Sequence, residues 1–144
     1  MKVLLDTNVL TALINTIDER HETAVRAVEE MVDAGETIVL VPQSLFEFWA
    51  VATRAKGENG LRLSADRALR YVRGFRERFP LLLDEPDLTD TFFNLMARHK
   101  VAGVNSHDGR LVAAMLTHGI PRMATFNAKD FRRYDETRTD RAIG

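Results

Sequence analysis

The chain has 144 residues, of which 45% are hydrophobic and 28% charged, and this is enough for one domain with a substantial apolar core. Its formal net charge of −1 excludes a protein that holds nucleic acid through an excess of positive charge alone. The absence of cysteine excludes disulfides, thiolate catalysis and cysteine zinc sites.

No stretch of the sequence approaches the roughly 20 consecutive apolar residues that a membrane-spanning helix needs. Asp6 also interrupts the apolar start of the chain, where a signal peptide requires an unbroken apolar region. We therefore expect a cytoplasmic protein without contact to membranes. It is predicted to form a single domain over residues 1–144, in which residues 131–144 are a charged C-terminal tail.

Strand and helix patterns alternate in the first part of the chain. The predicted elements are a strand at 3–5, a short helix at 8–15, a helix at 19–34, a strand at 37–41 and a helix at 43–55. The first strand is a short apolar run, typical of a strand buried on both faces of a parallel sheet. Gly35 stands where the second helix should end, and Pro42 ends the β-branched second strand.

The same alternation continues to the end of the chain. The predicted elements are a helix at 65–78 with Ser64 as its N-cap, a strand at 81–83, a helix at 88–98, a helix at 107–119 and a strand at 121–126. One more short strand is possible in the charged tail. Strands that alternate with helices predict an α/β fold with a mainly parallel sheet.

Acidic and amide side chains stand at or after the ends of the predicted strands. Asp6 directly follows the first strand, Glu47 lies one turn into the helix after the second, and Asp108 lies at the start of the helix before the last. Asn127 and Asp130 follow that last strand. Because ligands bind beyond the carboxyl ends of parallel strands, we expect these groups to meet at one edge. Such hard oxygen ligands predict a Mg²⁺ or Mn²⁺ site.

Each of these residues also has a purely structural interpretation. Asp6 is a typical N-cap for the helix that follows it. In the triplet Asp6-Thr7-Asn8, we expect Thr7 and Asn8 to have the structural roles, with side chains that bind nearby backbone groups.

Glu47 has a specific structural alternative, because Ser44 and Glu47 match the spacing of a capping box. However, Glu47 is the only charged residue between positions 42 and 53, and large apolar residues surround it. A carboxylate in such surroundings is costly unless it is paired or bound to a metal.

Asp108 stands at a predicted helix start, where negative charge is favourable by about 0.3–1 kcal/mol, so a helix-dipole role is the alternative there. Its neighbour His107 is a possible ligand or base, but we favour a non-catalytic role for it.

Several short motifs together resemble the PIN-domain family, and more narrowly the VapC-type toxins of toxin–antitoxin pairs. The motifs are "LLDTNVL" from residue 4, "SLFEFWAV" from residue 44, "HDGRLVAAM" from residue 107 and "GIPRMATFNAKDF" from residue 119. Each motif is short, but their combination, order and spacing agree with the family from the first strand to Phe131.

The resemblance implies a three-layer fold, with a sheet of about four to five strands between helices, and a metal-dependent endoribonuclease. Asp6 and Asp108 would be the main direct ligands of Mg²⁺ or Mn²⁺, and Glu47 would bind directly or through water. Asn127 belongs to the implied catalytic set, but many members carry an aspartate at this position. An amide adds no charge, so this departure leaves open whether one metal or two are bound.

The resemblance also implies partners. These are an RNA substrate (a tRNA, rRNA or mRNA), a second copy of the chain in a homodimer, and a small antitoxin protein. The antitoxin would lie in a groove between the helices at 42–55 and 64–78, with Phe46, Trp49 and Val72 as apolar contacts.

Two other functions remain as alternatives. A haloacid-dehalogenase-like phosphatase would use Asp6 as a covalent nucleophile, but that group places a second aspartate where this chain has Asn8. A catalytically degenerate metal-binding or protein-interaction module is the other alternative, and Asn127 is the residue that favours it.

Overall fold

The computed structural model describes residues 1–58 and 60–142, so the last two residues of the predicted tail lie outside the described part. The strands are β1 (Lys2–Leu5), β2 (Thr37–Val39), β3 (Arg122–Thr125) and β4 (Arg138–Ala142). The helices are α1 (Thr7–Ile14), α2 (His21–Asp33), α3 (Pro42–Thr53), α4 (Ala65–Arg78), α5 (Leu88–His99) and α6 (Ser106–His118). Three short 3₁₀ helices are η1 (Lys56–Glu58), η2 (Gly103–Asn105) and η3 (Ala128–Phe131).

The four strands form one sheet in the order β2-β1-β3-β4, and every neighbouring pair is parallel. The prediction of an α/β fold with a mainly parallel sheet is therefore confirmed. Parallel neighbours require crossovers, and the helices between the strands supply them.

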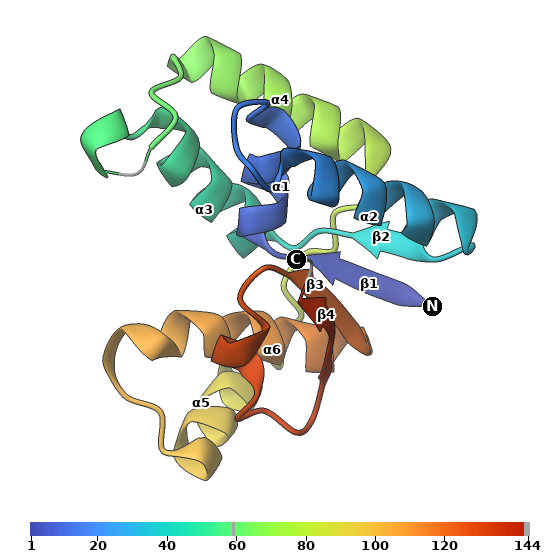
Figure 1. The fold of residues 1–144 in the computed structure, drawn as a ribbon. Coiled ribbons are helices and arrows are strands. Elements are labelled where there is room, and N and C mark those ends of the chain that lie inside the picture. Colours follow the sequence, from blue (N-terminus) through green and yellow to red (C-terminus); the bar gives the residue numbers. More distant parts are fainter. Residues whose placement is uncertain (59, 143–144) are drawn as a thin grey trace.

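Helices cover both faces of the sheet, as Figure 1 shows: α1 to α4 lie on one side, and α5 and α6 on the other. The alternation along β1 divides the core accordingly. Val3 and Leu5 pack in the cluster that includes Phe48 of α3 and Phe75 of α4, whereas Leu4 packs with Met115 of α6. The result is the expected three-layer arrangement, in which residues 3–5 of β1 and 123–125 of β3 are buried between the helices.

The carboxyl end of β1 is the place where the sheet order reverses. The chain leaves β1 toward β2 on one side, while β3 pairs on the other side with Leu5 opposite Ala124. The Asp6 N–H extends this pairing, because it donates to the Ala124 carbonyl at 3.0 Å. Ligand sites of open parallel sheets lie at such a reversal.

The strand predicted at 81–83 is the main error in the secondary-structure prediction. In its place is a single parallel bridge between Leu40 and Leu81. Pro80 has no N–H to extend the pairing, and Leu83 is exposed, so the apolar run turns away from the sheet. In the described part of the chain, none of the helices combines the length and the apolarity that crossing a membrane requires.

Candidate metal centre

Asp6 both caps a helix and faces the other predicted site residues. It is the N-cap of α1, where its Oδ1 accepts from the Thr7 N–H at 2.7 Å. Its Oδ2 accepts from the Thr125 hydroxyl at 2.7 Å and from the Asn8 amide at 3.3 Å. With only 8% of its surface exposed, Asp6 is held in one place by three donors from two strand ends.

Thr7 and Asn8 were predicted to bind nearby backbone groups. Their side chains instead connect elements that are distant in the sequence. The Thr7 hydroxyl lies 3.0 Å from Glu47 Oε2 and 3.3 Å from the Ser44 carbonyl, both on α3. The Asn8 Oδ1 accepts from the Phe126 N–H, just after β3, at 3.2 Å. Their structural role is therefore to join the end of β1 to α3 and β3.

Glu47 is held by side chains on α1 and α3. Its Oε1 accepts from the Gln43 amide at 2.8 Å, and the same amide donates to the His107 carbonyl at 2.8 Å. Gln43 thus fixes Glu47 and connects it to the start of α6. His107 contributes its backbone carbonyl here.

The capping-box interpretation of Ser44 and Glu47 is wrong. The N-cap of α3 is Val41, and the helix begins with Pro42. The Ser44 hydroxyl is fully buried and donates to the Leu5 carbonyl at 3.4 Å. Because Pro42 is favoured in the first turn, the helix starts before Ser44 and leaves Glu47 free for contacts with α1.

Asp108, in the first turn of α6, lies within the electrostatic field of the other acids. The pKa of Asp108 is raised to about 6, mainly by burial and also by the charges of Asp6, Asp130 and Glu47, while Arg133 acts in the opposite direction. The structure therefore brings together four carboxylates from four parts of the chain. We refer to Asp6, Glu47, Asp108 and Asp130 as the acidic cluster.

The pKa of Asp6 is also raised above its usual value. Burial is the main cause, and the charges of Glu47 and Asp130 contribute. The hydrogen bonds from Thr125 and Thr7 act in the opposite direction, because they stabilise the carboxylate. The acidic cluster therefore carries negative charge at a cost in free energy, which a bound cation would offset.

Asn127 and Asp130 follow β3 and differ in the charge that they bring to the acidic cluster. The Asn127 backbone N–H donates to the Thr125 hydroxyl at 3.0 Å, and its carbonyl accepts from the Asp130 N–H at 2.9 Å. Both side chains are exposed, but the charge of Asp130 affects the pKa of Asp6 and of Asp108. Asp130 therefore adds negative charge to the cluster, whereas Asn127 adds none.

Sequence reasoning missed Thr125 and Gln43, although signals for both were present. Thr125 ends β3 and, in the register that sets Leu5 opposite Ala124, comes next to Asp6. Gln43 precedes Glu47 by four residues, the spacing at which side chains of a helix meet. Both hold a carboxylate of the acidic cluster in position.

A second group of potential ligands lies at another place in the fold. Among the described residues, His99, Asp135 and Glu136 form the group whose three ligand atoms lie within 4.8 Å of one another. The Oε1 atom of Glu136 lies 2.7 Å from Nε2 of His99 and 3.1 Å from Nη1 of Arg98. Because the Arg98 guanidinium pairs with Glu136 and His99 lies within hydrogen-bond distance of it, we interpret the group as a polar network and not as the predicted site.

The residues of the acidic cluster fit a hard divalent cation. Carboxylate oxygens are the ligands that Mg²⁺ and Mn²⁺ prefer. Within residues 1–58 and 60–142, no three of these carboxylates approach as closely as the His99 group does. A cation held there would keep part of its water shell, as Mg²⁺ usually does.

Solved structures of similar fold come from several bacteria. VapBC2 from Rickettsia felis, bound to a promoter DNA fragment, matches with a TM-score of 0.75 and 16% identity, covering 97% of this chain and 98% of that one. Mycobacterium tuberculosis VapC20, described as a toxin that cleaves the sarcin–ricin loop, matches at 0.68 and 21%, covering 94% and 98%. A toxin–antitoxin complex from Klebsiella pneumoniae matches at 0.64 and 20%, covering 95% and 96%.

These structures show that the chain shares their fold. No curated protein sequence matches the chain significantly. The PIN domain family matches residues 3–137, which include the carboxyl ends of β1, β2 and β3 and every residue of the acidic cluster. This match covers most of the chain and speaks against the haloacid-dehalogenase-like alternative, and it shows that the chain belongs to the PIN domain family.

Proposed function

We propose that this protein is a divalent-metal-dependent endoribonuclease that hydrolyses phosphodiester bonds of RNA. The observation that carries the proposal is the acidic cluster at the carboxyl end of β1. Asp6 and Asp108 both have raised pKa values, caused by burial and by the neighbouring carboxylates. Uncompensated acids of this kind mark functional sites, and here they lie within a PIN domain.

In this proposal, Asp6 and Asp108 are the main ligands of a Mg²⁺ or Mn²⁺ ion, and Glu47 binds it directly or through water. Asn127 offers an amide oxygen without charge. Asp130 is the further carboxylate that compensates for Asn127, since its charge already affects both Asp6 and Asp108.

The protein's own contribution is to fix the ligands before substrate arrives. The Thr125 and Thr7 donors hold Asp6, and Gln43 and Thr7 hold Glu47. A bound divalent ion stabilises negative charge on phosphoryl oxygens and lowers the pKa of bound water, so the chain needs no nucleophilic side chain. We expect water to be the nucleophile and the products to carry a 5′-phosphate and a 3′-hydroxyl.

We further propose that the chain acts as a single domain in the cytoplasm, as the toxin of a toxin–antitoxin pair and as a homodimer. The support is the similarity in fold to the Klebsiella toxin–antitoxin complex and to VapC20, which is described as a toxin that cleaves the sarcin–ricin loop. Which RNA is cut depends on surface contacts outside the acidic cluster.

We propose the groove between α3 and α4 as one candidate antitoxin surface, and the structure offers a second one beside it. A cavity of about 390 Å³ lies between α1, α2 and α4. Its walls are formed by Leu13, Ile14, Val25, Val28, Glu29, Arg70, Tyr71, Gly74, Phe75 and Arg78. The predicted contacts Phe46, Trp49 and Val72 do not line this cavity, but Phe46 is 66% exposed and Trp49 37%, so both remain available to an antitoxin on α3. We propose that an apolar antitoxin segment covers the cavity.

The proposal is tested by RNA cleavage. Purified protein free of antitoxin is incubated with total cellular RNA and Mg²⁺ or Mn²⁺, then with chelator, beside an Asp6→Asn variant. Metal-dependent cleavage that the variant lacks would support the nuclease. Metal binding without cleavage would favour the alternative of a degenerate binding module, for which the uncharged Asn127 is the supporting observation.

A further inference from the structure

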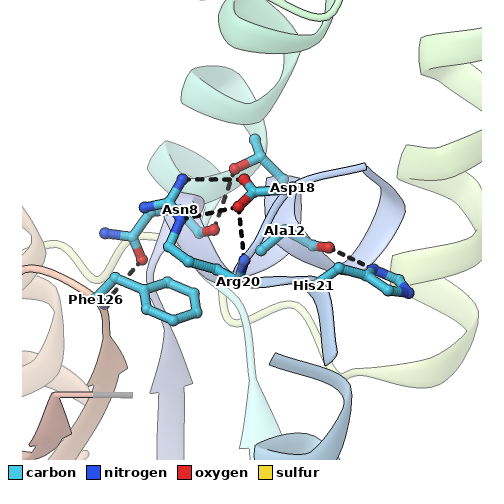
Figure 2. Close-up of polar contacts among 7 residues, drawn as sticks. Asn8, Ala12, Asp18, Arg20, His21 and Phe126 are labelled. Carbon is cyan, nitrogen blue, oxygen red and sulfur yellow. Dashed lines mark hydrogen bonds and ion pairs between the residues drawn. The ribbon is translucent and has the colours of Figure 1, made fainter. Parts of the chain in front are cut away.

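Arg20 lies beside the acidic cluster, in the turn between α1 and α2. Its guanidinium stacks over the Phe126 ring, with 4.9 Å between the guanidinium carbon and the ring centroid. The Phe126 N–H in turn donates to Asn8, whose amide binds Asp6. Figure 2 shows Arg20, Asn8 and Phe126 next to one another. Phe126, through its ring and its backbone N–H, and the side chain of Asn8 therefore connect Arg20 to the carboxylate of Asp6.

The Arg20 side chain is held in a fixed orientation. Asp18 Oδ1 accepts from the Arg20 backbone N–H at 2.8 Å and from its Nε at 3.3 Å, and Oδ2 accepts from its Nη2 at 3.1 Å. The turn itself is closed by the Asp18 N–H to the Asn15 carbonyl and the His21 N–H to the Asp18 carbonyl, both at 3.0 Å. A guanidinium that is already held by the Asp18 carboxylate and the Phe126 ring loses little further conformational freedom when it binds a ligand.

These contacts leave part of the guanidinium available. The Arg20 side chain is 42% exposed, whereas that of Asp18 is 17% exposed. In the described part of the chain, the hydrogen bonds of this side chain use Nε and Nη2 and none uses Nη1. The planar guanidinium fork matches the geometry of phosphate oxygens.

We infer that Arg20 is an RNA-binding residue that contacts a backbone phosphate next to the one held at the acidic cluster. The inference rests on the proposed function, because it takes RNA as the ligand. An acidic cluster repels a polyanion at every phosphate except the one that a metal binds. The positively charged Arg20 next to the acidic cluster offsets this repulsion and holds the neighbouring part of the RNA strand.

The test measures RNA binding as a function of salt. A fluorescent single-stranded RNA of mixed sequence is titrated with the Asp6→Asn protein and Mg²⁺, so that cleavage does not interfere. Each phosphate contact adds about 0.7 to the slope of log K against log salt for single strands. Adding Arg20→Gln should lower the slope by about this amount and weaken binding severalfold at low salt.

Two control variants separate a phosphate contact from a structural role. Arg76→Gln makes the same charge change on the exposed last turn of α4 and should leave the slope unchanged. Asp18→Asn loosens the turn but keeps the Arg20 charge, so it should lower thermal stability and preserve the slope. If Arg20→Gln resembles either control in slope, the inference is overturned.

Kinetics of the otherwise unmodified protein separate this inference from the proposed nuclease activity. Arg20→Gln should raise KM for RNA with little change in kcat, because a phosphate contact outside the reacting group binds ground and transition states alike. If the protein binds RNA with the expected slopes but never cleaves it, the nuclease proposal fails and the role of Arg20 stands. A protein that binds no RNA would overturn both.

Discussion

The two groups of acidic residues in this fold differ in what surrounds them. Asp135 and Glu136 face His99 and Arg98, and the ligand atoms of His99, Asp135 and Glu136 lie within 4.8 Å of one another. The acidic cluster is more widely spaced, yet the pKa of Asp108 is raised to about 6 there. The first group is a polar network that ties the end of α5 to the segment before β4.

The comparison shows that compensation of charge, more than proximity, distinguishes a candidate metal site. Paired charges within a protein satisfy one another and require no ligand. Acids that are buried beside other acids, as Asp6 is, carry their negative charge at a cost in free energy. A bound cation can offset this cost. Equal substitutions in the two groups should therefore have unequal consequences.

The largest difference is expected for RNA cleavage. Asp6→Asn should reduce the cleavage rate to below about a hundredth of that of the unmodified protein, because it removes the charge of a metal ligand at the reacting centre. Asp135→Asn makes the same change in the His99 group and should leave the rate within about a factor of two. Initial rates on RNA with Mg²⁺ measure both. Equal losses in the two variants would show that the site is assigned to the wrong group.

Thr125→Val should act on the acidic cluster through Asp6. It keeps the side-chain shape but removes the donor to Asp6, so metal affinity should fall by about 10–100-fold, as for partners behind a ligand. The free energy of unfolding should fall by about 1–3 kcal/mol, because the hydrogen bond is to a charged and buried group. Calorimetric titration with Mn²⁺ and chemical denaturation measure the two effects.

Thr117→Val is the matched control, since the Thr117 hydroxyl donates to the Ala114 carbonyl within α6. It should not alter metal affinity. Equal affinity in both threonine variants would contradict the role of Thr125.

The stability of the metal-free protein should depend on pH through Asp108. Because its pKa is raised from 3.8 to about 6, the folded state binds more protons than the unfolded state between these values. Stability from this residue should therefore fall as the pH rises from about 4 to about 6, and stay low above that. The measurement is the thermal midpoint in chelator between pH 4.5 and 7.5.

Asp108→Asn should flatten this dependence, and Mg²⁺ should flatten it in the unmodified protein. Asp135→Asn should leave the dependence as it is. A profile that Asp108→Asn does not change would assign the effect to other groups, with Asp6 the first to examine.

The smallest effect is expected for Glu136→Gln. This variant weakens the pairs with His99 and Arg98, and the free energy of unfolding should fall by about 1 kcal/mol. Metal affinity and RNA cleavage should stay unchanged. Denaturation in parallel with Mn²⁺ titration checks both, and a loss of metal affinity would mean that the His99 group itself binds the ion.

The sequence alone determined most of the order of strands and helices, apart from the strand predicted at 81–83, and the acids that come together at the sheet edge. The apolar run before Asp6 and the helical spacing around α2, α4 and α6 are local patterns, and the structure follows them. Parallel strands then bring their carboxyl ends to one side. The same residues indicated the PIN family, which the match over residues 3–137 confirms.

Only the tertiary structure decided which partners hold each acid. The Thr125 hydroxyl binds Asp6 across 119 positions of sequence, and Thr7 binds Glu47 across 40. Local patterns carry no information on such pairs, so Thr7 and Asn8 were wrongly expected to bind nearby backbone groups. The groove of α1, α2 and α4 and the position of Arg20 over Phe126 likewise depend on how separate elements pack. The physical reason is that the periodicity of apolar residues fixes which face of a helix or strand is buried. Packing and desolvation between elements then fix which residues that face contacts.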